Sequence, residues 1–167
     1  RDHARDPPGR TPDSLLPCGP DPWRARQRRR DTQRARGGEG LIVPTNVADE
    51  TSVKAMVVKT LETYGQINTL VNNAGITVFK HLFEATLEDW EHVMGVDLKG
   101  VFLCSKHAGV HMREHGGSVI NISSNHALAS FPDADIYAAA KAGVNGMTRA
   151  MATSLGKYGI RVNAIMP

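Results

Sequence analysis

The feature that most constrains the fold is an alternation of short apolar runs with longer segments of helical periodicity, which extends from residue 40 to the end of the chain. Four of these runs have the length and composition of buried strands, and they cover residues 41–43, 67–71, 118–122 and 160–165. Strands that alternate with helices form βαβ units with right-handed crossovers, and such units build a parallel sheet. The sequence therefore predicts an α/β fold in which helices flank a parallel sheet.

The helical segments between these runs carry start signals and a bend signal. Asp49 can cap a helix over Glu50–Tyr64, because its carboxylate can accept a hydrogen bond from a free backbone N–H of the first turn. Residues 86–89 have the composition of a capping box and should begin a second helix. A long helix is predicted from residue 93 to about residue 114, with one break or bend near Gly95.

Residues 1–36 differ from the rest of the chain in composition. They contain ten Arg and five Asp, six of the nine prolines, and no Val, Ile, Phe or Met. Such a segment cannot bury enough apolar surface to offset the entropy of ordering it, so residues 1–36 are predicted to be disordered and residues 37–167 to form the domain. Two alternatives stay open for this segment: phosphate contact through Arg28–Arg30, or a non-native origin such as an out-of-frame reading of GC-rich coding DNA.

The distribution of charge argues against nucleic acid as a partner. Residues 1–36 carry a net charge of +5 and residues 37–167 a net charge of −2, which together give the +3 of the whole chain. The basicity therefore lies outside the predicted domain. No apolar run approaches the roughly 20 residues of a membrane span, and the first residues lack the apolar core of a secretory signal. We therefore expect a cytoplasmic protein with no membrane partner.

The most informative stretch of the chain covers residues 116–157. Its apolar run ends in two hydroxyl residues, of which Ser124 is the second. In the helical segment that follows, Tyr137 and Lys141 are four residues apart, a spacing that places the phenol and the ammonium group on one face of a helix. A neighbouring cation favours the phenolate form of a tyrosine, so this pair is suited to general acid–base chemistry at neutral pH.

These residues, together with two further motifs, resemble the short-chain dehydrogenase/reductase family. Tyr137 follows Ser124 by 13 residues, Asn72–Gly75 read Asn-Asn-Ala-Gly, and the last six residues are Val162–Pro167. The resemblance implies a partial Rossmann-type domain that binds NAD or NADP. It also implies that Tyr137 exchanges a proton with a carbonyl or alcohol oxygen and that Ser124 hydrogen-bonds this oxygen. Lys141 would act on the phenol and on the nicotinamide ribose.

The resemblance, which begins at about residue 37, also assigns cofactor-binding residues. By the family's pattern Asn46 and Val47 lie at the adenine edge, while Asn73, Ala74 and Gly75 let the cofactor approach the backbone closely. An ordinary turn residue before a helix remains the alternative for Asn46. The family's glycine-rich loop for the cofactor pyrophosphate does not occur in this sequence, so the cofactor-binding half is expected to be incomplete.

Asp97 departs from the family's pattern. The family has an Asn in a Val-Asn-Leu-x-Gly motif, where residues 96–100 of this chain read Val-Asp-Leu-Lys-Gly. Either Asp97 takes the place of this fourth catalytic residue, or it is an ordinary helix residue that faces water.

Four histidines are further candidates for chemistry. Three of them are spaced four residues apart like half a zinc site: His107, His111 and His115. Arg113 lies close to them and would repel a metal cation, so a solvated or subunit-contacting helix face is the preferred interpretation and no metal site is predicted. His126, which follows Ser124 by two residues, could reach a substrate or could simply lie in water.

Two functions from different classes follow. The first is an NAD(P)-dependent oxidoreductase that interconverts a small carbonyl compound and an alcohol, with motifs similar to β-ketoacyl carrier-protein reductases and a homo-oligomeric state in the full-length family. The second is a catalytically inactive fragment that only self-associates through its long helices.

Overall fold

The computed structural model describes residues 38–167, and the helices and strands among these residues lie within Val43–Pro167. The segment predicted to be disordered, residues 1–36, lies outside the described residues, and so does Arg28–Arg30. The described elements follow one another in the order α2 (Glu50–Tyr64), β1 (Thr69–Asn72), α3 (Leu87–Met94), π-helix η1 (Gly95–Lys99), α4 (Gly100–Met112), β2 (Gly117–Ile122), 3₁₀-helix η2 (Asn125–Ala127), α5 (Asp135–Leu155), 3₁₀-helix η3 (Gly156–Tyr158) and β3 (Ile160–Ile165).

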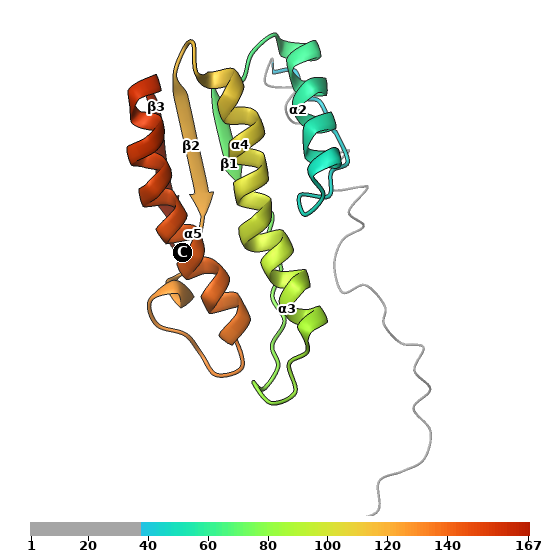
Figure 1. The fold of residues 1–167 in the computed structure, drawn as a ribbon. Helices are drawn as coiled ribbons and strands as arrows, with labels where there is room; N and C mark the ends of the chain where they lie inside the picture. The colour runs from blue at the N-terminus through green and yellow to red at the C-terminus, as the bar shows by residue number, and fades with distance from the viewer. Residues whose placement is uncertain (1–37) are drawn as a thin grey trace, which may run out of the picture. The chain divides into compact units, whose positions relative to one another are not determined.

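The three strands form one parallel sheet in the order β1-β2-β3 (Figure 1). Asn72 of β1 lies opposite Asn121 of β2, and Ile122 of β2 lies opposite Ile165 of β3. Parallel strands need a crossover connection, which α3, η1 and α4 supply between β1 and β2, and which α5 supplies between β2 and β3. The predicted parallel α/β architecture is therefore confirmed.

Helices α4 and α5 cover one face of the sheet, and α2 packs against α4 (Figure 1). The strand residues that face them are buried, among them Val119 of β2 and Ile160 of β3. Residues on the alternate positions are more exposed, and Val71 and Ile165 each keep more than half of their surface accessible. The main core therefore lies between the sheet and this layer of helices, where Met112 of α4 is fully buried.

The cap and the bounds of α2 were predicted correctly. The carboxylate of Asp49 accepts a hydrogen bond from the backbone N–H of Thr51 at 3.0 Å, which satisfies one of the free donors of the first turn. Gly65 ends the helix in the left-handed conformation with φ of 78°, a region that glycine enters without steric cost. The helix buries Val53 and Val57 against the core.

The capping box at Thr86 is also confirmed, but the helices that follow are continuous. Thr86 Oγ1 accepts from the backbone N–H of Asp89 at 3.1 Å, and the Asp89 carboxylate accepts from the backbone N–H of Thr86 at 2.9 Å. The bend expected near Gly95 is a turn of π-helix, η1, which joins α3 directly to α4. Gly95 keeps a right-handed helical conformation, so the helix widens there instead of breaking.

The prediction of a strand at residues 41–43 is wrong. These residues have no regular secondary structure, and the described part of the chain has no strand other than β1, β2 and β3. A strand is stabilised by the backbone hydrogen bonds of a neighbour, and an apolar run of three residues cannot form them alone. No helix within residues 38–167 has the length and apolar character needed to cross a membrane.

Candidate active site

The candidate site lies at the carboxyl ends of β1 and β2, which are neighbours in the sheet. Ligands of open parallel sheets bind at this edge, because the loops that leave the strands there converge. The residues that follow β1 are Asn73–Gly75, and those that follow β2 include Ser124. The first turns of α5 bring Tyr137 and Lys141 to the same edge, since α5 begins after the loop that leaves β2.

Lys141 is the most constrained charged residue of the site. Its side chain is 5% exposed, and its Nζ donates a hydrogen bond to the backbone carbonyl of Ile122 at 3.1 Å. The same Nζ lies 3.1 Å from Oδ2 of Asp97 and 5.3 Å from the centre of the Tyr137 ring. Tyr137 and Lys141 therefore lie together on one face of α5, as their spacing predicts, with the ammonium group held by the end of β2.

Asp97 does not face water, so that alternative of the sequence analysis is wrong. Its side chain is completely buried within η1, and Oδ1 accepts a hydrogen bond from the backbone N–H of Ile76 at 2.8 Å. Oδ2 makes the ion-pair contact with Lys141, although the angles there are not those of a hydrogen bond. A buried carboxylate needs a partner of opposite charge, and Asp97 finds it in Lys141.

Gly75 passes close to this ion pair. A Cβ atom at this position would lie 3.1 Å from Oδ2 of Asp97 and 3.3 Å from Nζ of Lys141. Both distances are shorter than ordinary van der Waals contacts, so the absence of a side chain lets the backbone after β1 run beside the pair. Gly75, one of the predicted cofactor-binding residues, therefore lies beside Lys141.

Ser124 caps the N-terminus of the 3₁₀-helix η2 and is buried. Its Oγ accepts a hydrogen bond from the backbone N–H of His126 at 3.3 Å and donates to Oδ1 of Asn125 at 3.3 Å. The preceding hydroxyl, Ser123, donates to the backbone carbonyl of Lys141 at 3.1 Å and so ties the end of β2 to α5. The two neighbouring serines thus differ in kind, because Ser123 bonds across to α5 and Ser124 bonds only within its loop.

The predicted cofactor-binding residues differ in their surroundings. Val47, Asn73 and Ala74 line one cavity of about 110 Å³ at the end of β1. Asn46 does not line it, and its side-chain Oδ1 accepts from the backbone N–H of Ala48 at 3.0 Å, as expected of a turn residue before a helix. Cys104 also borders the cavity, and burial raises the pKa of its thiol.

Sequence reasoning missed a buried chain of amides behind the site. Nδ2 of Asn72 donates to Oγ of Ser105 at 3.0 Å and to Oδ1 of Asn121 at 2.8 Å. Nδ2 of Asn121 donates to Oγ1 of Thr148 at 2.9 Å, and that hydroxyl donates to the carbonyl of Val144 at 2.7 Å. The signal was present in the sequence, because an Asn inside an otherwise apolar buried strand requires a polar partner.

Two of the three spaced histidines, His107 in α4 and His115 beyond its end, have hydrogen-bond partners within the protein. His107 Nε2 lies 2.8 Å from Oε1 of Glu50, and His115 Nε2 lies 3.1 Å from the backbone carbonyl of Ile67. Contacts with Lys106, His107 and Lys54 lower the pKa of the Glu50 carboxyl from 4.5 to about 2. Within residues 38–167, no group of three or more His, Cys, Asp or Glu side chains could hold a metal ion.

Comparison with known proteins gives a consistent match. A family model described as "Enoyl-(Acyl carrier protein) reductase" matches residues 23–167, beginning before the residue 37 at which the sequence motifs begin. An uncharacterized oxidoreductase of Thermotoga maritima is 46% identical over 140 residues, which are 83% of this chain and 55% of that protein. A 3-oxoacyl-[acyl-carrier-protein] reductase of Synechocystis is 41% identical over 134 residues, which are 80% of this chain and 54% of that protein.

Solved structures show the same likeness in three dimensions. A short chain dehydrogenase from Mycobacterium smegmatis superposes with a TM-score of 0.81 and 33% identity, over 84% of this chain and 60% of that chain. A putative short-chain alcohol dehydrogenase from Sinorhizobium meliloti gives a TM-score of 0.82 and 32% identity, over 84% and 56%. The chain spans about half the length of the curated relatives it matches. The match of the family model over most of the chain, together with these likenesses, places the chain in the short-chain dehydrogenase/reductase family of oxidoreductases.

Proposed function

We propose that this chain carries the proton-transfer half of an NAD(P)-dependent oxidoreductase that interconverts a carbonyl group and an alcohol. The observation that carries the proposal is the position of Lys141, whose ammonium group is buried 5.3 Å from the centre of the Tyr137 ring. A cation fixed beside a phenol stabilises the phenolate that proton transfer creates, so the phenol can act as a general acid and base. Because the chain spans about half the length of its relatives, the reaction is proposed for the whole protein.

The residues present fit a nicotinamide dinucleotide in part. The cavity at the end of β1 combines apolar walls from Val47 and Ala74 with the polar backbone and side chain of Asn73, which suits the adenosine half. Gly75 leaves the backbone open beside Lys141, which suits a ribose that approaches from the nicotinamide half. When bound, NAD or NADP supplies or accepts the hydride. The glycine-rich loop that would hold the pyrophosphate does not occur in the sequence.

Tyr137 would manage the proton of the reaction. In reduction, its hydroxyl donates a proton to the carbonyl oxygen while the carbonyl carbon receives the hydride, and a phenolate remains. In oxidation, the phenolate removes the hydroxyl proton of the alcohol. The hydroxyl of Ser124 would donate a hydrogen bond to the same oxygen, since its present bond to Asn125 is a long one of 3.3 Å that a small rotation replaces.

Lys141 has the donors that this arrangement needs. An ammonium group has three N–H donors, of which one bonds to Ile122 and another lies toward Asp97. The third would bind the hydroxyl groups of the nicotinamide ribose. Asp97 would then act as a positioning residue, because it contacts both Lys141 and the backbone N–H of Ile76 in the loop after β1.

The proposed substrate is a small carbonyl compound or its alcohol. Two named relatives, the 3-oxoacyl-[acyl-carrier-protein] reductases of Synechocystis and of Staphylococcus aureus, favour a β-ketoacyl thioester as the first compound to try. We expect the protein to act in the cytoplasm and as a homo-oligomer.

The test is steady-state turnover with Tyr137→Phe. Oxidation of NADH and of NADPH should be followed with a panel of ketones and β-ketoacyl thioesters, and the substitution should abolish turnover because it removes the proton donor. Tyr64→Phe is the matched control, since Tyr64 lies at the end of α2, away from the site. Turnover that survives in Tyr137→Phe would refute the assignment.

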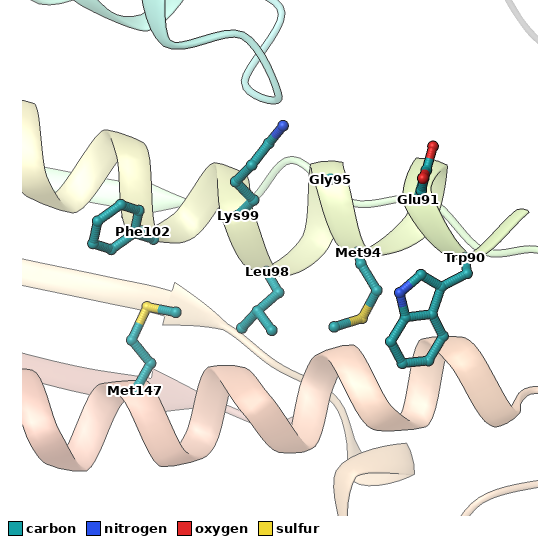
Figure 2. Close-up of a pocket in the computed structure, with 8 residues that line it drawn as sticks. All are labelled: Trp90, Glu91, Met94, Gly95, Leu98, Lys99, Phe102 and Met147. Atoms are coloured by element: carbon teal, nitrogen blue, oxygen red, sulfur yellow. The ribbon is translucent and has the colours of Figure 1, made fainter. Parts of the chain in front are cut away.

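A second candidate function, self-association, has its own supporting observation. A groove of about 490 Å³ runs between α3, η1 and α5, and Figure 2 shows Trp90, Met94 and Leu98 directed toward α5 while Lys99 points away. A second apolar groove of about 250 Å³ continues it and shares Phe102 and Met147 with it. Exposed apolar surface of this kind is typical of protein interfaces. Sedimentation of the wild type and of Phe102→Glu tests self-association. The wild type should sediment as a dimer and the variant as a monomer.

A further inference from the structure

We propose that His126 is a positioning residue that holds the phenol of Tyr137 in register with the hydroxyl of Ser124. The inference rests on the proposed function, because it assigns His126 to the same proton-transfer site. The sequence left open whether this loop histidine lies in water or at a substrate. In the structure, the ring of His126 is half-buried, and two other aromatic rings contact it.

The ring contacts of His126 are specific in geometry. Its ring centre lies 5.6 Å from that of Tyr137, with 77° between the two planes, and 5.0 Å from that of Phe131, with 74° between the planes. Both are edge-to-face arrangements, which aromatic rings prefer because the positive edge of one ring meets the negative face of the other. His126 therefore connects the half-buried ring of Tyr137 to Phe131, a residue of the same loop.

Hydrogen bonds fix the orientation of this imidazole. Nδ1 of His126 lies 3.2 Å from Oγ of Ser130. The single proton of that hydroxyl is donated to the backbone carbonyl of Phe131 at 3.0 Å, so the Ser130 oxygen is left to accept a hydrogen bond from Nδ1–H of His126. The ring is thereby held in one orientation by its own loop.

The backbone of His126 connects the same loop to Ser124. Its N–H donates to Ser124 Oγ at 3.3 Å, so one residue contacts Ser124 through its main chain and Tyr137 through its side chain. Tyr137 is otherwise contacted by Lys141 from its own helix. Ser124 and Tyr137 belong to different elements, the start of η2 and the first turn of α5, and His126 joins them.

Positioning predicts a loss in turnover with little change in substrate affinity. Misplacement of a reacting group by about 1 Å can cost up to about 100-fold in rate, so His126→Ala should lower kcat by about tenfold or more and change KM by less than about twofold. His126→Phe retains an aromatic ring and should recover most of kcat. His81→Ala is the matched control, because His81 makes a similar ring contact with Phe83 in another loop and should leave kcat unchanged.

A measurement without turnover makes the outcome independent of the proposed function. The Tyr137 ring and Cβ proton signals, identified by their loss in Tyr137→Phe, should move in His126→Ala, and the three-bond Hα–Hβ coupling constants should show rotamer averaging. Unchanged couplings, or a fall in kcat that His126→Phe does not restore, would overturn the inference. If wild type turns over no carbonyl compound, the proposed function fails alone, and the couplings still decide whether His126 holds Tyr137.

Discussion

The carboxylate of Asp97 lies 3.1 Å from the ammonium group of Lys141, and both side chains are almost completely withdrawn from solvent. The contact connects η1, in the crossover from β1 to β2, with the helix that carries Tyr137. Through its other oxygen, Asp97 also holds the backbone of Ile76 after β1. One buried carboxylate thus ties the loop after β1 to the helix of the candidate general acid.

Removal of this carboxylate should be costly. Asp97→Ala leaves the Lys141 ammonium group buried without a counter-ion, and breaking a buried pair in this way destabilises a protein by about 3–5 kcal/mol. Asp97→Asn should cost less, because an amide oxygen can still accept from the backbone N–H of Ile76. Glu91→Ala, at an exposed position of α3, serves as the control. If urea unfolding shows the same loss in free energy of unfolding for Asp97→Ala and Glu91→Ala, the assignment of a buried pair is contradicted.

Gly75 and Gly109 should respond in opposite ways to the same substitution. In Gly75→Ala, the new methyl group meets Asp97 and Lys141 at less than ordinary contact distance, and such overpacking costs about 1–3 kcal/mol. In Gly109→Ala, the methyl group meets nothing within 4 Å, and Ala in a helix is favoured over Gly by about 1 kcal/mol. Thermal unfolding should show a lower Tm for the first variant and a higher Tm for the second. Equal shifts in Tm for the two variants would show that a methyl group at residue 75 is not crowded by Asp97 and Lys141.

The buried amide chain predicts a large effect at Asn121. Asn121→Ala leaves Asn72 and Thr148 without one partner each, and every buried polar group left unpaired costs about 1–3 kcal/mol. Asn163→Ala on β3 removes an amide that is exposed and should cost much less. Equilibrium unfolding in guanidinium chloride compares the two variants. Similar losses would show that the chain of amides contributes little to stability.

The contacts of Glu50 with α4 predict an acid-dependent part of the stability. Lys106, His107 and Lys54 lower the pKa of the Glu50 carboxyl from 4.5 to about 2, so the folded state favours the charged form. Stability from this source is complete above about pH 4.5 and is lost as the pH falls toward 2. Glu50→Gln should therefore have a lower Tm than wild type at neutral pH, and the two curves should converge in acid. If the difference in Tm between wild type and Glu50→Gln stayed constant with pH, the ionised Glu50 carboxylate would not be its cause. Glu114→Gln serves as the control.

The candidate site was predictable where its chemistry depends on spacing along one element. Tyr137 and Lys141 are neighbours because a helix brings residues four apart onto one face, and this holds wherever the helix packs. Asp49 and Thr86 were found for the same reason, since a helix cap uses residues that are adjacent in sequence. The three paired strands follow from local apolar runs, and their alternation with helices predicts the parallel sheet.

What sequence reasoning could not supply depends on contacts between distant segments. The apolar run at residues 41–43 has the composition of a strand. A strand forms only where a neighbouring strand completes its backbone hydrogen bonds. Asp97 looks like a surface residue until the π-helix and α5 bring Lys141 beside it. His126 contacts Tyr137 only because the loop after β2 folds back over α5.

The sequence by itself therefore determined the parallel α/β class, the caps of its helices and the pairing of Tyr137 with Lys141, because each depends on periodicity within a short segment. Only the tertiary structure decided which polar groups are buried together. The ion pair of Asp97 and Lys141 and the amides of Asn72 and Asn121 form across gaps of more than 40 residues. Such contacts depend on how helices and strands pack, and packing is a property of the whole domain.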